Sequence, residues 1–191
     1  MSSHPFDAAL KLQALAPGRY AGQTSADYWN MVGPFGGYTA ATVLAAILRH
    51  PGLLGAPLSI TVNFAAALAQ GPFEVQLHAA RTNRSTQHWT AAIVQNDAQG
   101  QPVVVTTATA VTAARRETWS LSDQPMPRVS APGEMSAMRY EQAMAWLDHY
   151  ELRPVSGMIP QTWDGSQRDD SVTRLWMRDH PPRPLDFCSL L

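Results

Sequence analysis

The chain is poor in several features that define common classes of protein. Only one of its 191 residues is a cysteine, Cys188, so an intramolecular disulfide framework is excluded. Charged residues make up 15% of the sequence and the net charge is −1, which indicates no basic surface for nucleic acid or an anionic membrane. No apolar run is long enough to span a bilayer, and the first residues do not resemble a signal peptide. We therefore expect a cytoplasmic protein with no nucleic-acid or membrane partner.

The signatures of several enzyme classes are missing as well. The six histidines show no metal-ligand spacing. There is no Gly-x-Ser-x-Gly elbow, so the nucleophilic serine of an α/β-hydrolase is excluded. A phosphate-binding loop and a dinucleotide fingerprint are also lacking. The sequence therefore predicts neither a metal nor a bound cofactor.

The most informative feature that is present is an apolar helix opened by a pair of glycines. Gly36 and Gly37 lead into an apolar run that ends near His50, and this predicts a helix over about 36–50 that is buried all round. A helix N-terminus presents free N–H groups, and glycine lets a ligand approach the backbone closely. The N–H groups of Gly36, Gly37 and Tyr38 could therefore hold a developing oxyanion. The alternative is that the glycines only permit a tight turn and close helix–sheet packing.

Alternating segments after the helix predict an antiparallel sheet. Residues 58–64 alternate strictly, with Leu58, Ile60, Val62 and Phe64 on one face. Further strands are expected over 73–79, 89–94 and 103–111. Before the long helix, we expect a helix over 6–15 and strands or hairpins over 19–22 and 27–32. A sheet that covers one buried helix belongs to the α+β class.

The pattern of predicted strands ends in a proline-rich stretch, and a similar pattern begins after it. Residues 146–154 and 171–178 resemble entry strands, and Leu185–Leu191 resembles the start of a second apolar helix. We interpret this as an internal repeat whose second copy is incomplete. The expected organisation is a domain over 1–117, a linker over 118–138 and the start of a second domain over 139–191.

Several motifs, taken in order, resemble those of hotdog-fold acyl-CoA thioesterases. They are Phe35–Tyr38 at the helix entrance, Val62–Phe64 with Gly71-Pro72, the turn Arg81–Ser85, the strands within 94–109, Arg174–Arg178 and Arg183–Asp186. The arrangement is similar to the double-hotdog, bacterial acyl-CoA thioesterase II-like form, in which two hotdog units lie in one chain. One motif departs from the family pattern, because Thr82-Asn83 stands where the family has Asp-Gly.

The resemblance implies a hotdog fold and the hydrolysis of a fatty or short- to medium-chain acyl-CoA thioester by an activated water. It implies no metal and no cofactor, and a homo-oligomer, either a dimer or a tetramer of hotdog pairs. The catalytic carboxylate of that family lies on the helix of the second unit, so we expect it beyond Leu191. A non-catalytic module that binds acyl chains or coenzyme A, and a hotdog hydratase or dehydratase, are the alternatives.

The resemblance also suggests which side chains meet the substrate. Phe35, Tyr38 and Phe64 are expected to line the acyl site around the helix entrance. Asn63 points to the other face of its strand, where it contacts the substrate or a partner hotdog unit, or is an ordinary sheet-face amide.

Three further polar residues are candidates for roles in binding or catalysis. Arg84 could meet the phosphates of coenzyme A, and Ser85 could help to orient the attacking water. For both, an ordinary place in a surface turn is the alternative. Asp186 lies in the first turn of the second helix, where it is either a catalytic acid or a helix cap.

Overall fold

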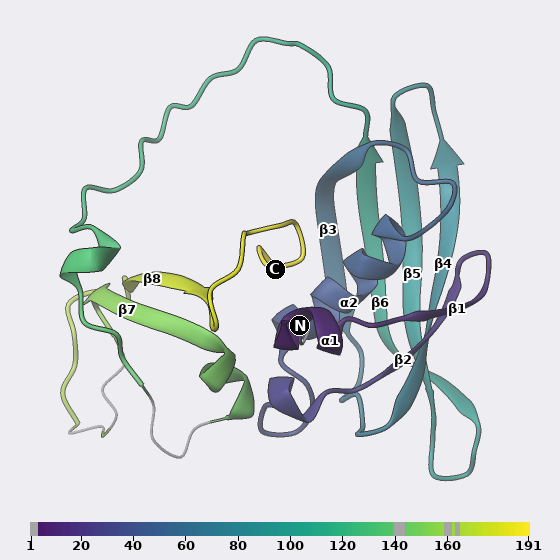
Figure 1. The fold of residues 1–191 in the computed structure, drawn as a ribbon, viewed down its shortest axis with the longest axis horizontal. Helices are drawn as coiled ribbons and strands as arrows, with labels where there is room; N and C mark the ends of the chain where they lie inside the picture. The colour runs from purple at the N-terminus through teal and green to yellow at the C-terminus, as the bar shows by residue number, and fades with distance from the viewer. Residues whose placement is uncertain (1–3, 140–143, 159–161, 163–164) are drawn as a thin grey trace.

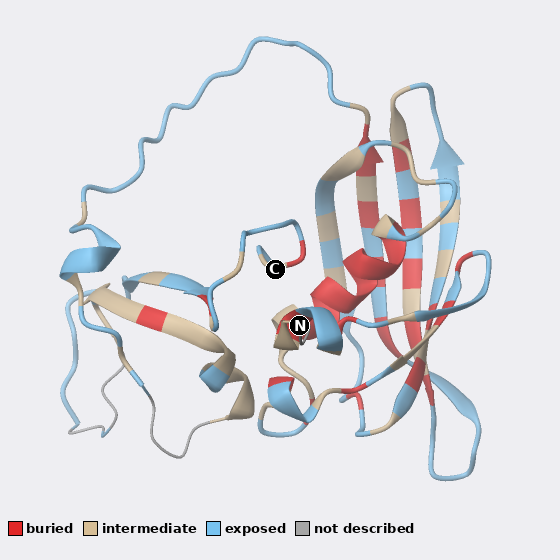
Figure 2. Cartoon of the chain, in the orientation of Figure 1, coloured by how far each residue is buried: buried red, intermediate tan, exposed pale blue. Residues whose placement is uncertain are grey.

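The long apolar helix is enclosed by the rest of the chain. The structure, a computed structural model, describes residues 4–139, 144–158, 162 and 165–191. Helix α2 spans Gly36–Leu48, and every residue from Tyr38 to Ile47 is buried (Figure 2). At its C-terminal end the Arg49 N–H donates to the Ala45 carbonyl, and the His50 N–H donates to the Ile47 carbonyl.

A six-stranded antiparallel sheet covers one side of α2 (Figure 1). Its strands, in sheet order, are β1 (Gln13–Ala16), β2 (Arg19–Gln23), β4 (Pro72–Thr82), β5 (Thr86–Asn96), β6 (Pro102–Ala113) and β3 (Ala56–Phe64). The last strand, β3, pairs with β6 on one side, with Phe64 opposite Thr106, and forms an edge of the sheet.

The main core lies between α2 and this sheet. Val43 and Ile47 from the helix pack with Val75, Trp89 and Ile93 from the central strands. Burying side chains of this size stabilises the fold by about 1.5–3 kcal/mol each. The Trp89 indole N–H is also satisfied, because it donates to the hydroxyl of Thr112 at 3.1 Å.

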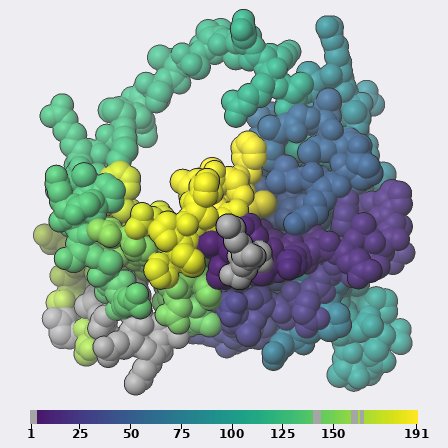
Figure 3. Space-filling model, viewed as in Figure 1, coloured from purple at the N-terminus to yellow at the C-terminus, as the bar shows by residue number. Residues whose placement is uncertain are grey.

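A second cluster covers the opposite side of α2. It consists of α1 (Pro5–Ala9), the 3₁₀ helix η1 (Ala26–Tyr28) and residues near the C-terminal end of the chain. The Tyr28 and Tyr38 rings stack with centroids 5.6 Å apart. Cys188 is buried in the same cluster, and Figure 3 shows the C-terminal segment in yellow against the purple N-terminal segment. The two ends of the sequence therefore help to bury one helix.

The remaining part of the chain forms a small two-stranded sheet. Residues 115–128 are exposed and arch away from the other elements (Figure 3). They lead to the 3₁₀ helices η2 (Pro132–Glu134) and η3 (Ala145–His149) and to the antiparallel strands β7 (Tyr150–Ser156) and β8 (Arg174–Asp179). A turn over 187–190 follows. No helix in the described ranges is long and apolar enough to cross a membrane.

The predicted α+β hotdog fold is confirmed, with corrections at its ends. The expected helix over 6–15 is wrong after Ala9, because residues 13–16 form the edge strand β1. Residues 27–32 do not form a strand. They start in η1 and continue into a tight turn in which the Asn30 N–H donates to the Gly33 carbonyl at 2.7 Å.

The strict alternation expected for 58–64 also fails at its start. The β3–β6 register shifts between Pro57 and Ser59, and Leu58 lies exposed at this irregularity. Ile60 and Val62 do pack against the main core, as expected.

The start of β3 generates a stability prediction. Gly55 has a φ of +74°, and a Cβ there would collide with the Ala113 backbone, whereas Gly100 has a φ of +77° with open space around it. Gly100→Ala therefore measures only the free-energy cost of a side chain at positive φ, about 1–2 kcal/mol. We expect Gly55→Ala to lower the free energy of unfolding in urea by at least about 2 kcal/mol more than that. Equal losses in the two variants would show that the backbone contact is unimportant.

Candidate functional site

The candidate site is the N-terminus of α2. Gly36 and Gly37 occupy the first helical positions, after the N-cap residue Phe35, and no side chain caps this end. The first intrahelical bond runs from the Thr39 N–H to the Phe35 carbonyl at 3.1 Å. The N–H groups of the first turn precede that bond, and with the helix dipole they favour a negative charge at this end. This geometry can bind an oxyanion or another small anion.

Aromatic side chains lie beside the first turn of α2. The Phe35 ring stacks on Trp146 of η3, with centroids 4.2 Å apart and planes 7° apart. From the sheet side, the Phe64 ring lies against Gly36, where an added Cβ would be 3.3 Å from its Cζ atom. The predicted residues Phe35, Gly36, Gly37 and Phe64 are thus brought together.

A third wall comes from the far end of the sequence. A Cβ at Gly37 would lie 2.9 Å from the Leu191 carbonyl oxygen and 2.6 Å from the Phe35 ring. Because Gly37 has no side chain, the Phe35 ring and the Leu191 backbone can both lie close to it. At this position the packing role of glycine is visible in the structure.

Tyr38 contributes its backbone to this end of the helix but not its side chain. Its ring is fully buried in the second cluster, beside Tyr28. Its hydroxyl donates toward the carbonyls of Gln23 at 3.2 Å and Ala9 at 3.3 Å. Burial raises the pKa of this phenol, so it stays protonated and engaged.

Asn63 lies on the face of β3 that points away from the helix. Its neighbour Val62 packs on the core, whereas Asn63 is exposed. Its amide nitrogen is 3.5 Å from the Thr107 hydroxyl of β6. The structure therefore separates Asn63 from the N–H groups of α2.

Arg84 and Ser85 lie at the opposite end of the sheet. They form the β4–β5 turn, which is closed by the Asn83 N–H donating to the Thr86 carbonyl at 2.8 Å. Next to this turn, the Gln87 side chain binds Gly52 and Leu54 in the loop after the helix. The turn therefore neighbours the C-terminal end of α2, and the 13-residue helix is about 20 Å long.

Asp186 is engaged in local contacts. One carboxylate oxygen accepts a bond from the Ser189 N–H at 2.9 Å, and the other accepts from Arg183 at 2.9 Å. Partial burial acts to raise its pKa, but the Ser189 N–H and the Arg183 guanidinium outweigh that effect and lower the pKa. Asp186 is thus an ionised carboxylate that caps the turn over 187–190; the structure has this turn where a second helix over 185–191 is predicted.

Two residues near the site were not singled out from the sequence. Trp146 stacks on Phe35, and Arg183 forms ion pairs with Asp7 at 2.8 Å, Asp186 at 2.9 Å and the buried Asp179 at 3.8 Å. Only the spacings of Arg183 from Asp179 and from Asp186 are local enough to be found from the sequence. The described residues contain no group of three or more His, Cys, Asp or Glu that could hold a metal ion.

Comparison with known proteins agrees with the fold. A family model described as the acyl-CoA thioesterase N-terminal domain matches residues 25–113. A hotdog-fold protein of unknown function from Alicyclobacillus acidocaldarius is 43% identical, with a TM-score of 0.89 over 99% of this chain and 67% of that one. No curated protein matches.

Two mycobacterial structures share the fold at lower identity. An acyl-CoA thioesterase II from Mycobacterium marinum is 20% identical, with a TM-score of 0.69 over 97% of this chain and 66% of that one. A tesB protein from Mycobacterium avium is 18% identical, with a TM-score of 0.69 over 95% of this chain and 62% of that one. The chain thus spans about two thirds of the length of these relatives.

The fold and the glycine-opened helix define a hotdog protein. Together with the family model and the 43% identical hotdog relative, they show that the chain carries the N-terminal hotdog domain of the acyl-CoA thioesterase family over residues 25–113.

The two glycines of the site generate a paired prediction. Gly37→Ala places a methyl group against both Phe35 and residue 191, whereas Gly36→Ala meets only the edge of the Phe64 ring. We expect Gly37→Ala to shift the indole N–H resonance of Trp146 and to lower the free energy of unfolding by about 1 kcal/mol or more. Gly36→Ala is expected to leave both nearly unchanged. If the two variants behave alike, the packing role of Gly37 is wrong.

Proposed function

We propose that this chain supplies the oxyanion-binding half of an acyl-CoA thioesterase that acts on fatty or short- to medium-chain acyl-CoA. The observation that carries the proposal is the glycine-opened N-terminus of α2, which no side chain caps and which Phe35 and Phe64 flank. Family membership supports the choice of a thioester as the substrate.

The reaction assigns a defined task to these groups. Water attacks the thioester carbonyl carbon, and the carbonyl oxygen becomes an oxyanion that the Gly36 and Gly37 N–H groups stabilise. The carbon–sulfur bond then breaks, which releases the carboxylic acid and the coenzyme A thiolate, and a general base takes the proton of the water. Phe35 and Phe64 provide apolar surface for the first carbons of the acyl chain.

The general base has to come from elsewhere in the assembled enzyme. The first turn of α2 carries no acidic residue. Asp186 is the catalytic candidate from the sequence, but Arg183 and Ser189 lower its pKa, which makes it a weaker base. We therefore assign the base to the second hotdog unit that we propose to begin within residues 139–191. In this proposal Asn63, Arg84 and Ser85 contact distant parts of coenzyme A or a partner unit rather than the reacting carbonyl.

The edge of the sheet supports an assembly of hotdog units. Strand β3 has a sheet neighbour on one side only, and two large apolar residues on it, Leu58 and Phe64, are 68% and 58% exposed. An unpaired edge with exposed apolar side chains is suited to pairing with another strand. A homo-oligomer, or pairing with a second unit, would cover this edge next to the α2 N-terminus.

A second candidate is a module that binds acyl-CoA without hydrolysing it. The absence of an acidic residue from the first turn of α2 favours this alternative for the 191-residue chain alone. Release of free thiol from acyl-CoA distinguishes the two functions, and the affinity for a non-hydrolysable acyl-CoA thioether tests the binding that both require. If the chain neither binds the thioether nor releases thiol, both candidates are wrong.

A proline substitution tests the oxyanion role directly. Gly36 is at the first helical position, where proline fits, and Phe35 has the extended backbone (φ −54°, ψ 136°) that a following proline requires. Gly36→Pro removes one N–H donor and leaves the helix in place. We expect the hydrolysis rate to fall by about 10²–10³. In a chain that only binds, a non-hydrolysable ketone analogue that keeps the carbonyl, with a methylene between it and the sulfur, should bind less tightly.

Gly36→Ala is the matched control, because it also adds a Cβ beside Phe64 but retains the N–H group. It should retain most of the activity or affinity. If the proline variant performs as well as the alanine variant, the Gly36 N–H has no part in the site.

A further inference from the structure

A second candidate site lies on the small two-stranded sheet, on residues that the proposed function does not use. A cavity of about 300 Å³ is lined there by residues of β7 and β8 and by the chain that leads into β7. The lining residues are Pro132, Gly133, Glu151, Arg153, Trp176, Met177 and Arg178. This volume is at the lower end of the range for pockets that bind small molecules.

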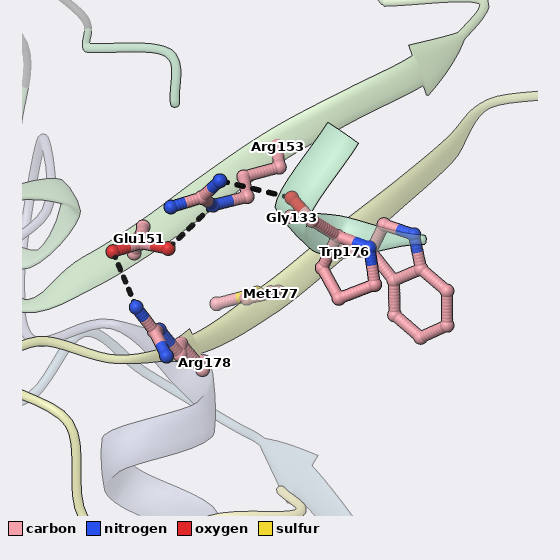
Figure 4. A pocket seen from close by; sticks show the side chains of 7 residues that line it. Gly133, Glu151, Arg153, Trp176, Met177 and Arg178 are labelled. Carbon is pink, nitrogen blue, oxygen red and sulfur yellow. Dashed lines mark hydrogen bonds and ion pairs between the residues drawn. The ribbon is translucent and has the colours of Figure 1, made fainter. Parts of the chain in front are cut away.

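The register of the two strands explains why these side chains meet. Glu151 is opposite Arg178, and Arg153 is opposite Trp176, so the two cross-strand pairs share one face of the ribbon. In Figure 4 the three charged side chains gather at one end, Trp176 and Gly133 lie at the other, and Met177 lies between them. The pocket thus has a charged end and an aromatic end.

The charged end carries an excess of one positive charge. Glu151 accepts a bond from Arg153 at 2.6 Å and one from Arg178 at 2.9 Å. Hydrogen bonds from Arg178 and Arg153 lower the pKa of Glu151 to about 2, so it stays ionised and holds both guanidinium groups in place. Two guanidinium groups against one carboxylate leave an attraction for an anion.

The two arginines contribute differently to that attraction. Arg153 also donates to the carbonyls of Pro132 at 2.9 Å and Met135 at 2.8 Å, so its side chain links the segment 132–135 to β7. Arg178 uses one terminal nitrogen for Glu151, and its side chain is 51% exposed. Its other N–H donors are therefore available to a ligand.

The aromatic end is fixed in orientation. The Trp176 indole N–H donates to the Ser130 carbonyl at 2.9 Å, and this bond holds the ring against the segment around Ser130. Pro132 and Gly133 of η2 form the adjacent wall. A held indole presents a flat apolar surface on which another ring can stack.

We propose that this pocket binds a small molecule in which a flat aromatic ring carries one anionic group, a carboxylate or a phosphate. The ring lies at Trp176, and the anionic oxygens accept hydrogen bonds from Arg178. This ligand is the one that uses both ends of the pocket. An uncharged ring would use only the aromatic end, and an aliphatic anion would use only the charged end.

Three probes that share one ring test the proposal. Phenylacetate and phenyl phosphate carry the two possible anions, and phenylacetamide is the neutral control for phenylacetate. Titration of the ¹⁵N-labelled 191-residue chain is followed at the Trp176 indole N–H resonance, which the spectrum of Trp176→Phe identifies among the six tryptophans. At least one anion should shift this resonance saturably, with an affinity about tenfold or more above that of the amide.

Variants of two arginines on the same strand make the test specific. Arg178→Gln should weaken binding of the anion about tenfold or more. Arg174→Gln removes an exposed arginine of β8 that does not line this pocket, and it should leave binding unchanged. The anion that binds more tightly shows which of the two groups the pocket prefers.

Several results would overturn the proposal. They are the absence of a saturable shift with both anions, equal binding of the amide, and equal binding by Arg178→Gln and the unaltered chain. If Arg178→Gln fails to fold, Trp176→Leu replaces it, with binding measured by calorimetry; undiminished affinity in that variant overturns the proposal as well. None of these measurements depends on thioester hydrolysis.

Discussion

Helix α2 has to be covered on two sides, and most of the structure follows from that requirement. A surface helix needs one apolar stripe, but α2 is buried from Tyr38 to Ile47 and has no polar face to expose. The six-stranded sheet covers the side that carries Val43 and Ile47. The other side is covered by α1, η1 and the segment around Cys188. The sheet alone would leave half of the helix in water.

The candidate site lies where the sheet and the second cluster meet, at the first turn of α2. Phe64 reaches the first turn of α2 from the end of β3, and Trp146 reaches it from η3 through its stack with Phe35. The sheet approaches the helix backbone at Gly36, through Phe64, and the C-terminal segment approaches it at Gly37, through Leu191. The lack of side chains at these two positions is what permits this close packing against the helix backbone.

Local patterns were enough to predict the centre of the fold. The apolar run after Gly37 predicts α2, alternation predicts β3 and β4, and β-branched residues predict β6, because each of these signals lies within one element. For the edge strand β1 the sequence wrongly predicts a helix. All four of its residues are exposed, so burial imposes no alternation there. Residues 27–32 contain apolar and aromatic side chains typical of a strand, but Tyr28 is buried by stacking on Tyr38 instead.

The candidate site was predictable only in part, for the same reason. Gly36 and Gly37 mark a helix start, which is a local feature. The position of Arg84 and Ser85 depends on the register of β4 and β5, which places their turn beside the C-terminal end of α2. Trp146 meets Phe35 across more than a hundred residues of sequence, and no spacing rule relates them.

Arg183 joins segments that are far apart in the sequence. Its guanidinium pairs with Asp7 of α1, with Asp179 at the end of β8 and with Asp186, and it lies 5.5 Å from the Phe6 ring centroid. Because one side chain serves both ends of the chain, α1 and the turn over 187–190 cannot loosen independently. In native-state hydrogen exchange they should open as one cooperative unit with a common free energy, although 176 residues separate Arg183 from Asp7.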